Sequence, residues 1–305
     1  MTPKPVIQAS NLRKVYGETV AVDDLSFEVF EGEIFGLLGP NGAGKTTTME
    51  CVEGARRPDG GTLRVLSLDP RRDANALQLR IGVQLQQAQL QKRIKVWEAL
   101  DLWASLYPKT VDVESLLEQL GLTEKRHTWF MNLSGGQQQR LFIALALVHD
   151  PELVFLDELT TGLDPQARRT IWDLVLGIKE RGKTVFLTTH LMEEAERLCD
   201  RVAILEHGRL IALGTPEALV REHCPERTVV LSTPWSGGEA FENLPGMRSV
   251  QRNGEAWTLE GEGDDFVSEV IQCLAENSIQ VKDLRTQQPN LEDVFLRLTG
   301  HHIRD

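Results

Sequence analysis

A glycine-rich stretch, GPNGAGKTT at residues 39–47, matches the pattern of a phosphate-binding loop. It follows the apolar run IFGLLG and precedes a helical pattern, which is the strand–loop–helix context that such a loop requires. Glycines let backbone N–H groups turn inward around a β-phosphate, Lys45 adds charge at the β- and γ-phosphates, and Thr46 places a hydroxyl on Mg²⁺. The predicted phosphate-binding residues are Gly39, Pro40, Asn41, Gly42, Ala43, Gly44, Lys45, Thr46 and Thr47.

Two carboxylates end a second apolar run, LVFLDE at 153–158. Asp157 is placed to hold Mg²⁺ directly or through water, and Glu158 is placed to orient and deprotonate an attacking water. A third run, TVFLTTH at 184–190, ends in the same way and brings His190 within reach of a γ-phosphate. The alternatives are solvated surface carboxylates and a structural histidine. The apolar runs argue against them, because they place these side chains at the mouth of a buried sheet.

The stretch LSGGQQQRLFIALALVHD at 133–150 predicts a second anion site. Asn132 and Ser134 are helix-capping residue types, and the apolar run at 141–148 predicts a buried helix. A helix start with bare backbone N–H groups and a free hydroxyl favours an anion. The alternative is a capped helix without a ligand.

The elements that position these residues are predicted to form two domains. Residues 1–35 alternate like antiparallel strands, and apolar strands alternating with helices predict a parallel sheet covered on both faces. Residues from about 88 to 148 predict an inserted α-helical subdomain. We therefore expect an α/β phosphate-loop NTPase core over 1–222 and a small C-terminal α+β domain over 225–305.

In the second domain, TVVLSTP, RSVQRNGEAWTLEGE and IQVKDLRT predict strands, with Asn-Gly at a hairpin turn. DFVSEVIQCLAENS and LEDVFLRLTG predict helices, and the latter places Leu291, Val294, Phe295 and Leu298 on one apolar face. Two roles stay open for this face: packing on the domain's own sheet, or a share in contact between subunits.

Composition narrows the class of protein. The 305 residues carry a net charge of −12, which argues against nucleic acid as the main partner. The longest apolar run, LFIALALV, is far shorter than the roughly twenty residues of a membrane-spanning helix, and the start lacks the apolar core of a signal peptide. The widely spaced cysteines favour free thiols in a reducing cytoplasm over disulfides or a zinc site. They are Cys51, Cys199, Cys224 and Cys273.

Together these motifs resemble the nucleotide-binding subunit of an ABC transporter, over nearly the whole chain. The resemblance implies the ABC ATPase fold, with ATP and Mg²⁺ as cofactors. It implies that Tyr16 in KVYG stacks on adenine and that Gln86 in IGVQLQ senses Mg²⁺ and water and reports to the membrane partner. Asp164 in TTGLDP then lies in a loop that crosses a dimer interface. The signature consists of Ser134, Gly135, Gly136 and Gln137.

The resemblance also implies the assembly. In this family two subunits sandwich two ATP molecules head to tail, so the signature contacts the γ-phosphate bound to the other chain. One loop and one signature in this chain imply pairing with a second ATPase subunit, and we prefer a homodimer to a pair of paralogues. A capped helix without a ligand would not explain why both half-sites are present.

The end of the chain, GTPEALV followed by a small domain ending NLEDVFLRLTG, resembles the drug- and antibiotic-export ATPases of the daunorubicin-resistance type. These use a separate permease polypeptide, which implies a location on the inner face of the cell membrane. One departure is Leu159, where the family usually has proline. Leucine does not fix φ and restores an N–H, so we expect a looser turn around Glu158.

Two rival functions remain to be weighed. A non-transport ABC ATPase acting on nucleic acid or ribosomes usually carries long coiled coils or two cassettes, and this acidic sequence has neither. A phosphate-loop kinase or GTPase would not use LSGGQ, and the guanine-reading pattern NKxD does not occur in the sequence.

Overall fold

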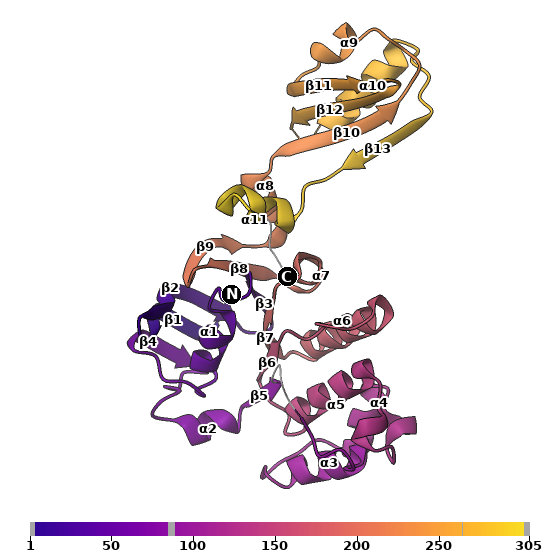
Figure 1. Ribbon diagram of the computed structural model, residues 1–305. Helices are drawn as coiled ribbons and strands as arrows, with labels where there is room; N and C mark the ends of the chain where they lie inside the picture. Colours follow the sequence, from indigo (N-terminus) through magenta and orange to yellow (C-terminus); the bar gives the residue numbers. More distant parts are fainter. Residues whose placement is uncertain (1–3, 85–88, 264, 302–305) are drawn as a thin grey trace. The chain divides into compact units, whose positions relative to one another are not determined.

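The computed structural model describes residues 4–84, 89–263 and 265–301. The chain divides into two compact units between Pro216 and Glu217, and each unit is described by itself (Figure 1). Helix α8, at Pro216–His223, falls almost entirely in the second unit, whereas the sequence places this segment at the end of the first domain.

A six-stranded sheet with the order β5-β6-β7-β3-β8-β9 forms the centre of the first unit. All neighbouring strands are parallel except β8 and β9, which pair antiparallel. Every residue of β3, β6 and β7 is buried, as their continuous apolar runs predict. The strands are β3 at Ile34–Leu38, β5 at Ile81–Gln84, β6 at Leu153–Asp157, β7 at Thr184–Thr189, β8 at Arg201–Glu206 and β9 at Arg209–Gly214.

A three-stranded antiparallel sheet, with the order β2-β1-β4, accompanies the central sheet. Its strands are β1 at Pro5–Tyr16, β2 at Thr19–Phe30 and β4 at Gly60–Val65. Apolar side chains on the inner face of β2 join a buried cluster with helix α1, at Lys45–Val52, and with the central sheet. Phe27 of β2 stacks on Phe35 of β3 with ring centroids 5.6 Å apart. The predicted antiparallel region over 1–35 is therefore confirmed, and its core is shared with the phosphate-loop helix.

The segment expected to form a helical subdomain, which the structure describes from residue 89 to 148, carries helices. Its elements are α3 at Val96–Ala104, α4 at Val113–Gln119, the 3₁₀ turns η1 at Thr123–Lys125 and η2 at Phe130–Asn132, and α5 at Gly135–Leu147. Three further helices complete the first unit: α2 at Ala74–Gln78, α6 at Pro165–Glu180 and α7 at Met192–Leu198 (Figure 1).

The second unit contains a four-stranded antiparallel sheet with the order β11-β12-β10-β13. Helix α10 packs on it and buries Phe266, Val270 and Leu274 against Val229 and Trp257. The strands are β10 at Glu226–Ser232, β11 at Met247–Asn253, β12 at Ala256–Glu262 and β13 at Asp283–Gln287. The helices are α9 at Glu239–Glu242, α10 at Phe266–Glu276 and α11 at Leu291–Thr299. This arrangement is the predicted α+β domain.

Two details of the second unit bear on the sequence expectations. The strand expected over IQVKDLRT begins only at Asp283, because Ile279 is buried in the core beside α10 and the Thr233 hydroxyl donates to the Gln280 carbonyl. On α11, Leu291, Val294 and Phe295 are fully buried but are not part of the cluster on the sheet, and Leu298 is 36% exposed.

Two expectations from composition can be compared with the structure. The four cysteines are buried free thiols, as predicted. Within the described residues, no helix combines the length and the apolar character needed to span a membrane.

Candidate nucleotide site

The phosphate loop connects β3 to α1, and its backbone needs glycine at particular positions. Gly39, Gly42 and Gly44 all have positive φ, at 153°, 83° and 96°. A Cβ on Gly39 would overlap the Leu205 carbonyl oxygen, and one on Gly44 would overlap the Ala21 carbonyl oxygen. Only glycine, which has no Cβ, can adopt this conformation while the backbone approaches so closely. The loop therefore begins helix α1 at Lys45 with its first N–H groups directed toward the loop, as an anion requires.

Lys45 connects the loop to the carboxylates. Its side chain is 4% exposed, and its Nζ donates to the carbonyl oxygens of Gly39 and Pro40 at 2.9 and 3.1 Å. The same Nζ lies 3.8 Å from Glu158 Oε1. Burial lowers the pKa of Lys45, while the Glu158 and Asp157 carboxylates oppose that shift. The site thus carries a buried cation at the end of the central sheet.

Asp157 ends β6 beside the loop and is 4% exposed. The Thr188 hydroxyl donates to its Oδ1, and its own N–H donates to Gln84 Oε1 at 3.2 Å. Burial raises the pKa of Asp157, and hydrogen bonds from the hydroxyls of Thr188 and Thr46 oppose that shift. A carboxylate and the Thr46 hydroxyl are oxygen donors of the kind that Mg²⁺ prefers. The described residues contain no group of three or more His, Cys, Asp or Glu side chains suited to a metal.

Glu158 and His190 face one another at the same edge. Glu158 has the left-handed φ of 45°, and its N–H donates to the Thr188 carbonyl at 3.1 Å. Its Oε1 lies 3.4 Å from His190 Nδ1, and the two side chains are only 8% and 14% exposed. The structure therefore brings together four of the predicted residues, Lys45, Asp157, Glu158 and His190. A cation, two carboxylates and an imidazole at a phosphate loop are suited to phosphoryl transfer to water.

Comparison with known proteins decides the family. The family described as ABC transporter matches residues 22–161. The Nod factor export ATP-binding protein I of Bradyrhizobium diazoefficiens is 41% identical over 307 residues, which cover 97% of this chain and 97% of that protein. This chain belongs to the ATP-binding subunits of ABC transporters.

Solved structures agree with the family. An ATP-binding cassette of an ABC transporter in its ADP conformation is 25% identical, with a TM-score of 0.65, and covers 72% of this chain and 94% of its own. A dimeric cassette in a post-hydrolysis state, bound to ADP and Pi, is 26% identical, with a TM-score of 0.62, and covers 68% of this chain and 98% of its own. The ABC ATPase described here has the cassette fold and is an ATP-binding and ATP-hydrolysing subunit.

The signature of the ABC ATPase begins helix α5. Ser134 is the N-cap, where its hydroxyl accepts from the Gln137 N–H at 3.3 Å and its own N–H donates to Gln137 Oε1 at 3.0 Å. This reciprocal pair is a capping box, and it leaves the helix start exposed. Asp164 caps α6. The first turns of α5 and α6 lie close together, because a Cβ on Gly136 would lie 3.1 Å from Ala167 Cβ. Signature and Asp164 loop therefore lie side by side.

The remaining predicted residues lie elsewhere or outside the described chain. Tyr16 ends β1 and is 39% exposed, with Lys14 Nζ 5.4 Å and Arg56 Cζ 5.3 Å from its ring centroid. Gln86 lies outside the described residues. Leu159, which stands at the usual proline position, is 2% exposed.

Sequence reasoning missed three polar residues of this edge. Thr188 pairs with Asp157 across β6 and β7, Gln84 accepts from the Asp157 N–H, and Glu194 contacts the turn after Glu158. Gln84 ends β5 and Thr188 is the residue before the end of β7, so the same signal was present in the sequence. Glu194 lies in a charged stretch, EEAE, that looks like a solvated helix face.

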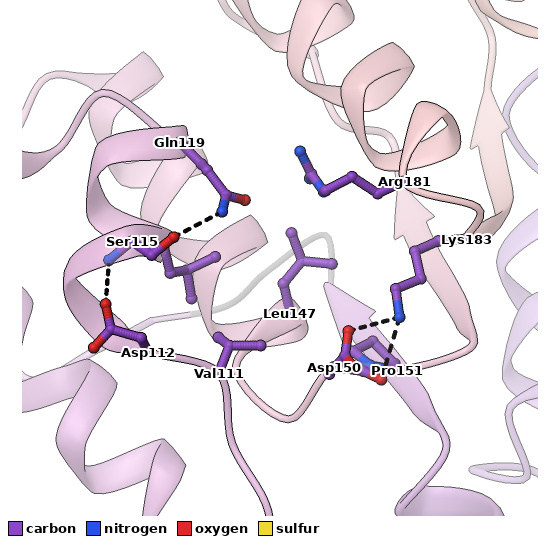
Figure 2. Close-up of a pocket in the computed structure, with 10 residues that line it drawn as sticks. Val111, Asp112, Ser115, Gln119, Leu147, Asp150, Pro151, Arg181 and Lys183 are labelled. Carbon is purple, nitrogen blue, oxygen red and sulfur yellow. Dashed lines mark hydrogen bonds and ion pairs between the residues drawn. The ribbon is translucent and has the colours of Figure 1, made fainter.

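A separate cavity of about 460 Å³ is not the nucleotide site (Figure 2). It lies between α4 and the turn after α6, where Lys183 pairs with Asp150 at 2.6 Å. Asp150 precedes β6 and Lys183 precedes β7, whereas Asp157 and Thr189 end these strands. The cavity therefore lies at the amino ends of the strands, away from the phosphate loop.

Proposed function

We propose that this ABC ATPase powers export of a drug, antibiotic, lipid or similar cargo through a separate membrane-spanning permease. The observation that carries the proposal is the similarity to Nod factor export ATP-binding protein I, which extends over 97% of the chain and so includes the second unit. On this proposal the ATPase is cytoplasmic and reaches the inner face of the cell membrane through the permease. The ATPase domain spans 1–222 and the accessory domain 225–305, with the structural division falling slightly earlier, at Pro216.

The residues of the site take the following roles in the proposal. The loop amides and Lys45 bind the β- and γ-phosphates, and Tyr16 stacks on adenine. Asp157, Thr46 and Gln86 would hold Mg²⁺, which supplies positive charge that stabilises the developing charge on the phosphates. The buried Asp157 and the adjacent Thr46 support this assignment.

Glu158 acts as the general base. It accepts a proton from water while the water oxygen forms a bond to the γ-phosphorus and the bond from that phosphorus to the bridging oxygen of ADP breaks. His190 positions Glu158 and the γ-phosphate, which is consistent with the 3.4 Å between the imidazole and the carboxylate. The buried setting strengthens these electrostatic contacts.

A second ATPase subunit completes each site. Ser134, Gly135, Gly136 and Gln137 contact the γ-phosphate bound to the opposing chain, and Asp164 lies at the interface. The exposed start of α5 supports this role, because backbone N–H groups at a helix start favour an anion. We propose a homodimer.

Affinity purification from solubilised membranes tests the transport role. The tagged full chain is expected to retain a polytopic membrane protein, and ATP hydrolysis by that complex should load cargo into vesicles in the direction of export. Retention of ribosomes or nucleic acid in place of a membrane protein would instead support the non-transport ABC ATPase.

A further inference from the structure

A buried carboxylate outside the nucleotide site joins the segments that carry the proposed catalytic residues. Glu194 lies in the first turn of α7 and is 1% exposed. Its Oε1 accepts from the Thr160 hydroxyl at 2.8 Å and from the Trp172 indole N–H at 2.9 Å. Thr160 and Trp172 are themselves 0% and 2% exposed. A carboxylate so deeply buried is costly unless it is hydrogen-bonded, so this arrangement needs a reason.

The three segments that meet at Glu194 are the ones that follow Glu158, His190 and Asp164. Thr160 lies two residues after Glu158, and Glu194 lies four residues after His190. Trp172 belongs to α6, the helix that Asp164 caps (Figure 1). One carboxylate oxygen therefore fixes the turn after the general base, the helix after the histidine and the helix after the interface loop.

The backbone at Glu158 explains why such a tie is needed. Its φ of 45° is disfavoured for a residue with a side chain and persists only where the surroundings hold it. Proline at 159 would restrict the backbone there, but Leu159 does not. The hydrogen bond that the Thr160 hydroxyl donates to Glu194 Oε1 anchors a residue of that turn.

We propose that Glu194 is a positioning residue that keeps Glu158 and His190 in their productive separation. The inference rests on the proposed roles of those two residues. Glu194 does not touch the nucleotide, so it acts on turnover rather than on ATP affinity. Charge-assisted hydrogen bonds to two different segments give it the stiffness that this task requires.

Thr160→Val tests the proposal with a change of nearly constant shape. We expect kcat for ATP to fall about 10-fold, less than the roughly 10²-fold that a 1 Å displacement can cost, because only one of the two hydrogen bonds to Glu194 is lost. The dissociation constant for ATP should stay within about twofold of the parent, since the loop and Lys45 are untouched. The matched control is Thr233→Val, which removes an equally buried hydroxyl and its 2.8 Å hydrogen bond to Gln280 in the second unit.

Two variants of Glu194 sharpen the test. Glu194→Met removes the acceptor for both donors and should lower kcat more than Thr160→Val does. Glu194→Gln keeps an oxygen at the same place and should retain a kcat within about threefold of the parent. The double variant Thr160→Val/Glu194→Met should be no slower than Glu194→Met alone, because both changes break the same network.

The failing outcomes are distinct. The inference is wrong if Thr160→Val loses no more turnover than Thr233→Val, if it loses ATP affinity in proportion to kcat, or if Glu194→Gln is as slow as Glu194→Met. Glu158→Gln is measured alongside. If that variant turns over at the parent rate, the role of Glu158 and the inference fail together, whereas a slow Glu158→Gln with an unaffected Thr160→Val overturns the inference alone.

Discussion

The two units of this chain differ in how many polar side chains they bury. Of the twelve buried polar or charged side chains among the described residues, eleven lie in the first unit, and Thr233 alone lies in the second. Burying such groups costs free energy unless they are hydrogen-bonded or paired. The second unit avoids this cost with an apolar core, whereas the first unit concentrates Lys45, Asp157 and their partners where strands end at the phosphate loop.

Backbone strain follows the same division. Seven of the eight described non-glycine residues with positive φ lie in the first unit, Glu158 among them, and Ser278 is the one in the second. The solved cassettes cover 68–72% of this chain, whereas the protein from Bradyrhizobium covers 97%. The solved cassettes therefore match a smaller part of this chain than the Bradyrhizobium protein does.

The strongest test of this division is Glu158→Gln. We expect ATP binding to persist and hydrolysis to slow by about 10²–10⁴-fold, because the variant loses its general base. ATP that is bound but not hydrolysed should hold two chains together, as seen by size-exclusion chromatography with ATP. Monomers with unchanged turnover would remove Glu158 from this role.

Lys45→Ala and Ser134→Arg separate the two halves of one site. Lys45→Ala should weaken ATP binding about 10- to 100-fold through loss of a charged hydrogen-bond donor. Ser134→Arg should spare binding and block ATP-dependent dimers and hydrolysis, because we propose that the signature serves the opposing chain. Equilibrium binding of a fluorescent ATP analogue measures the first effect, and phosphate release measures the second.

Mixing these two variants supplies the control. A mixed dimer retains one composite site, built from the intact loop of the Ser134→Arg chain and the intact signature of the Lys45→Ala chain. Partial recovery of hydrolysis is therefore expected on mixing. Equal loss of ATP affinity in both single variants would contradict a site shared between chains.

Glu53, at the end of α1, tests the buried charge of the first unit through pH. It is 3% exposed, and burial, followed by the Glu50 and Asp157 charges, raises its pKa from 4.5 to about 7. Because the folded pKa lies above the unfolded one, its stabilising contribution is complete below about pH 4.5 and is lost as the pH rises through 7. Glu53→Gln should therefore stabilise the fold more at pH 8 than at pH 5, with a difference in the free energy of unfolding on the order of 3 kcal/mol, and should raise Tm accordingly.

Thermal unfolding monitored by circular dichroism across pH 5–8 measures this difference. The control is Glu217→Gln, which changes an exposed carboxylate of the second unit. A gain from Glu53→Gln that is the same at pH 5 and pH 8 would mean that burial does not shift this carboxyl.

Removal of the second unit should have the smallest effect. A chain ending at Thr215 stops before α8, whereas a cut after Val220 would fall inside that helix. If the second unit supports pairing, ATP affinity should stay within about threefold of the parent, since the buried polar network is untouched. Dimers in ATP should decrease a few-fold by light scattering, measured with Glu158→Gln in both chains. A shortened chain that pairs like the full one, or that loses ATP affinity, would contradict the accessory role.

Most residues of the site could be predicted from the sequence, because each lies in a short segment with its own recognisable pattern. Residue type and spacing predict the phosphate loop from the glycines at 39, 42 and 44 and the lysine at the next position. They predict the end of a strand from carboxylates directly after an apolar run. Parallel strands place their carboxyl ends at one edge, so Lys45, Asp157, Glu158 and His190 were predictable as neighbours. The periodicity of apolar residues likewise predicts the helical insertion and the mixture of helices and strands in the second unit.

Only the tertiary structure decided which polar residues support that edge. Glu194 looks like one of several acidic residues on a solvated helix, yet it is buried between Thr160 and Trp172, which lie 34 and 22 residues away. Burial of α11 apart from the sheet core, and the late start of β13, likewise depend on which surfaces meet. The spacing of residue types along a chain predicts the secondary structure of each segment. The partner of a buried group depends instead on packing between segments far apart in the sequence, which no local pattern contains.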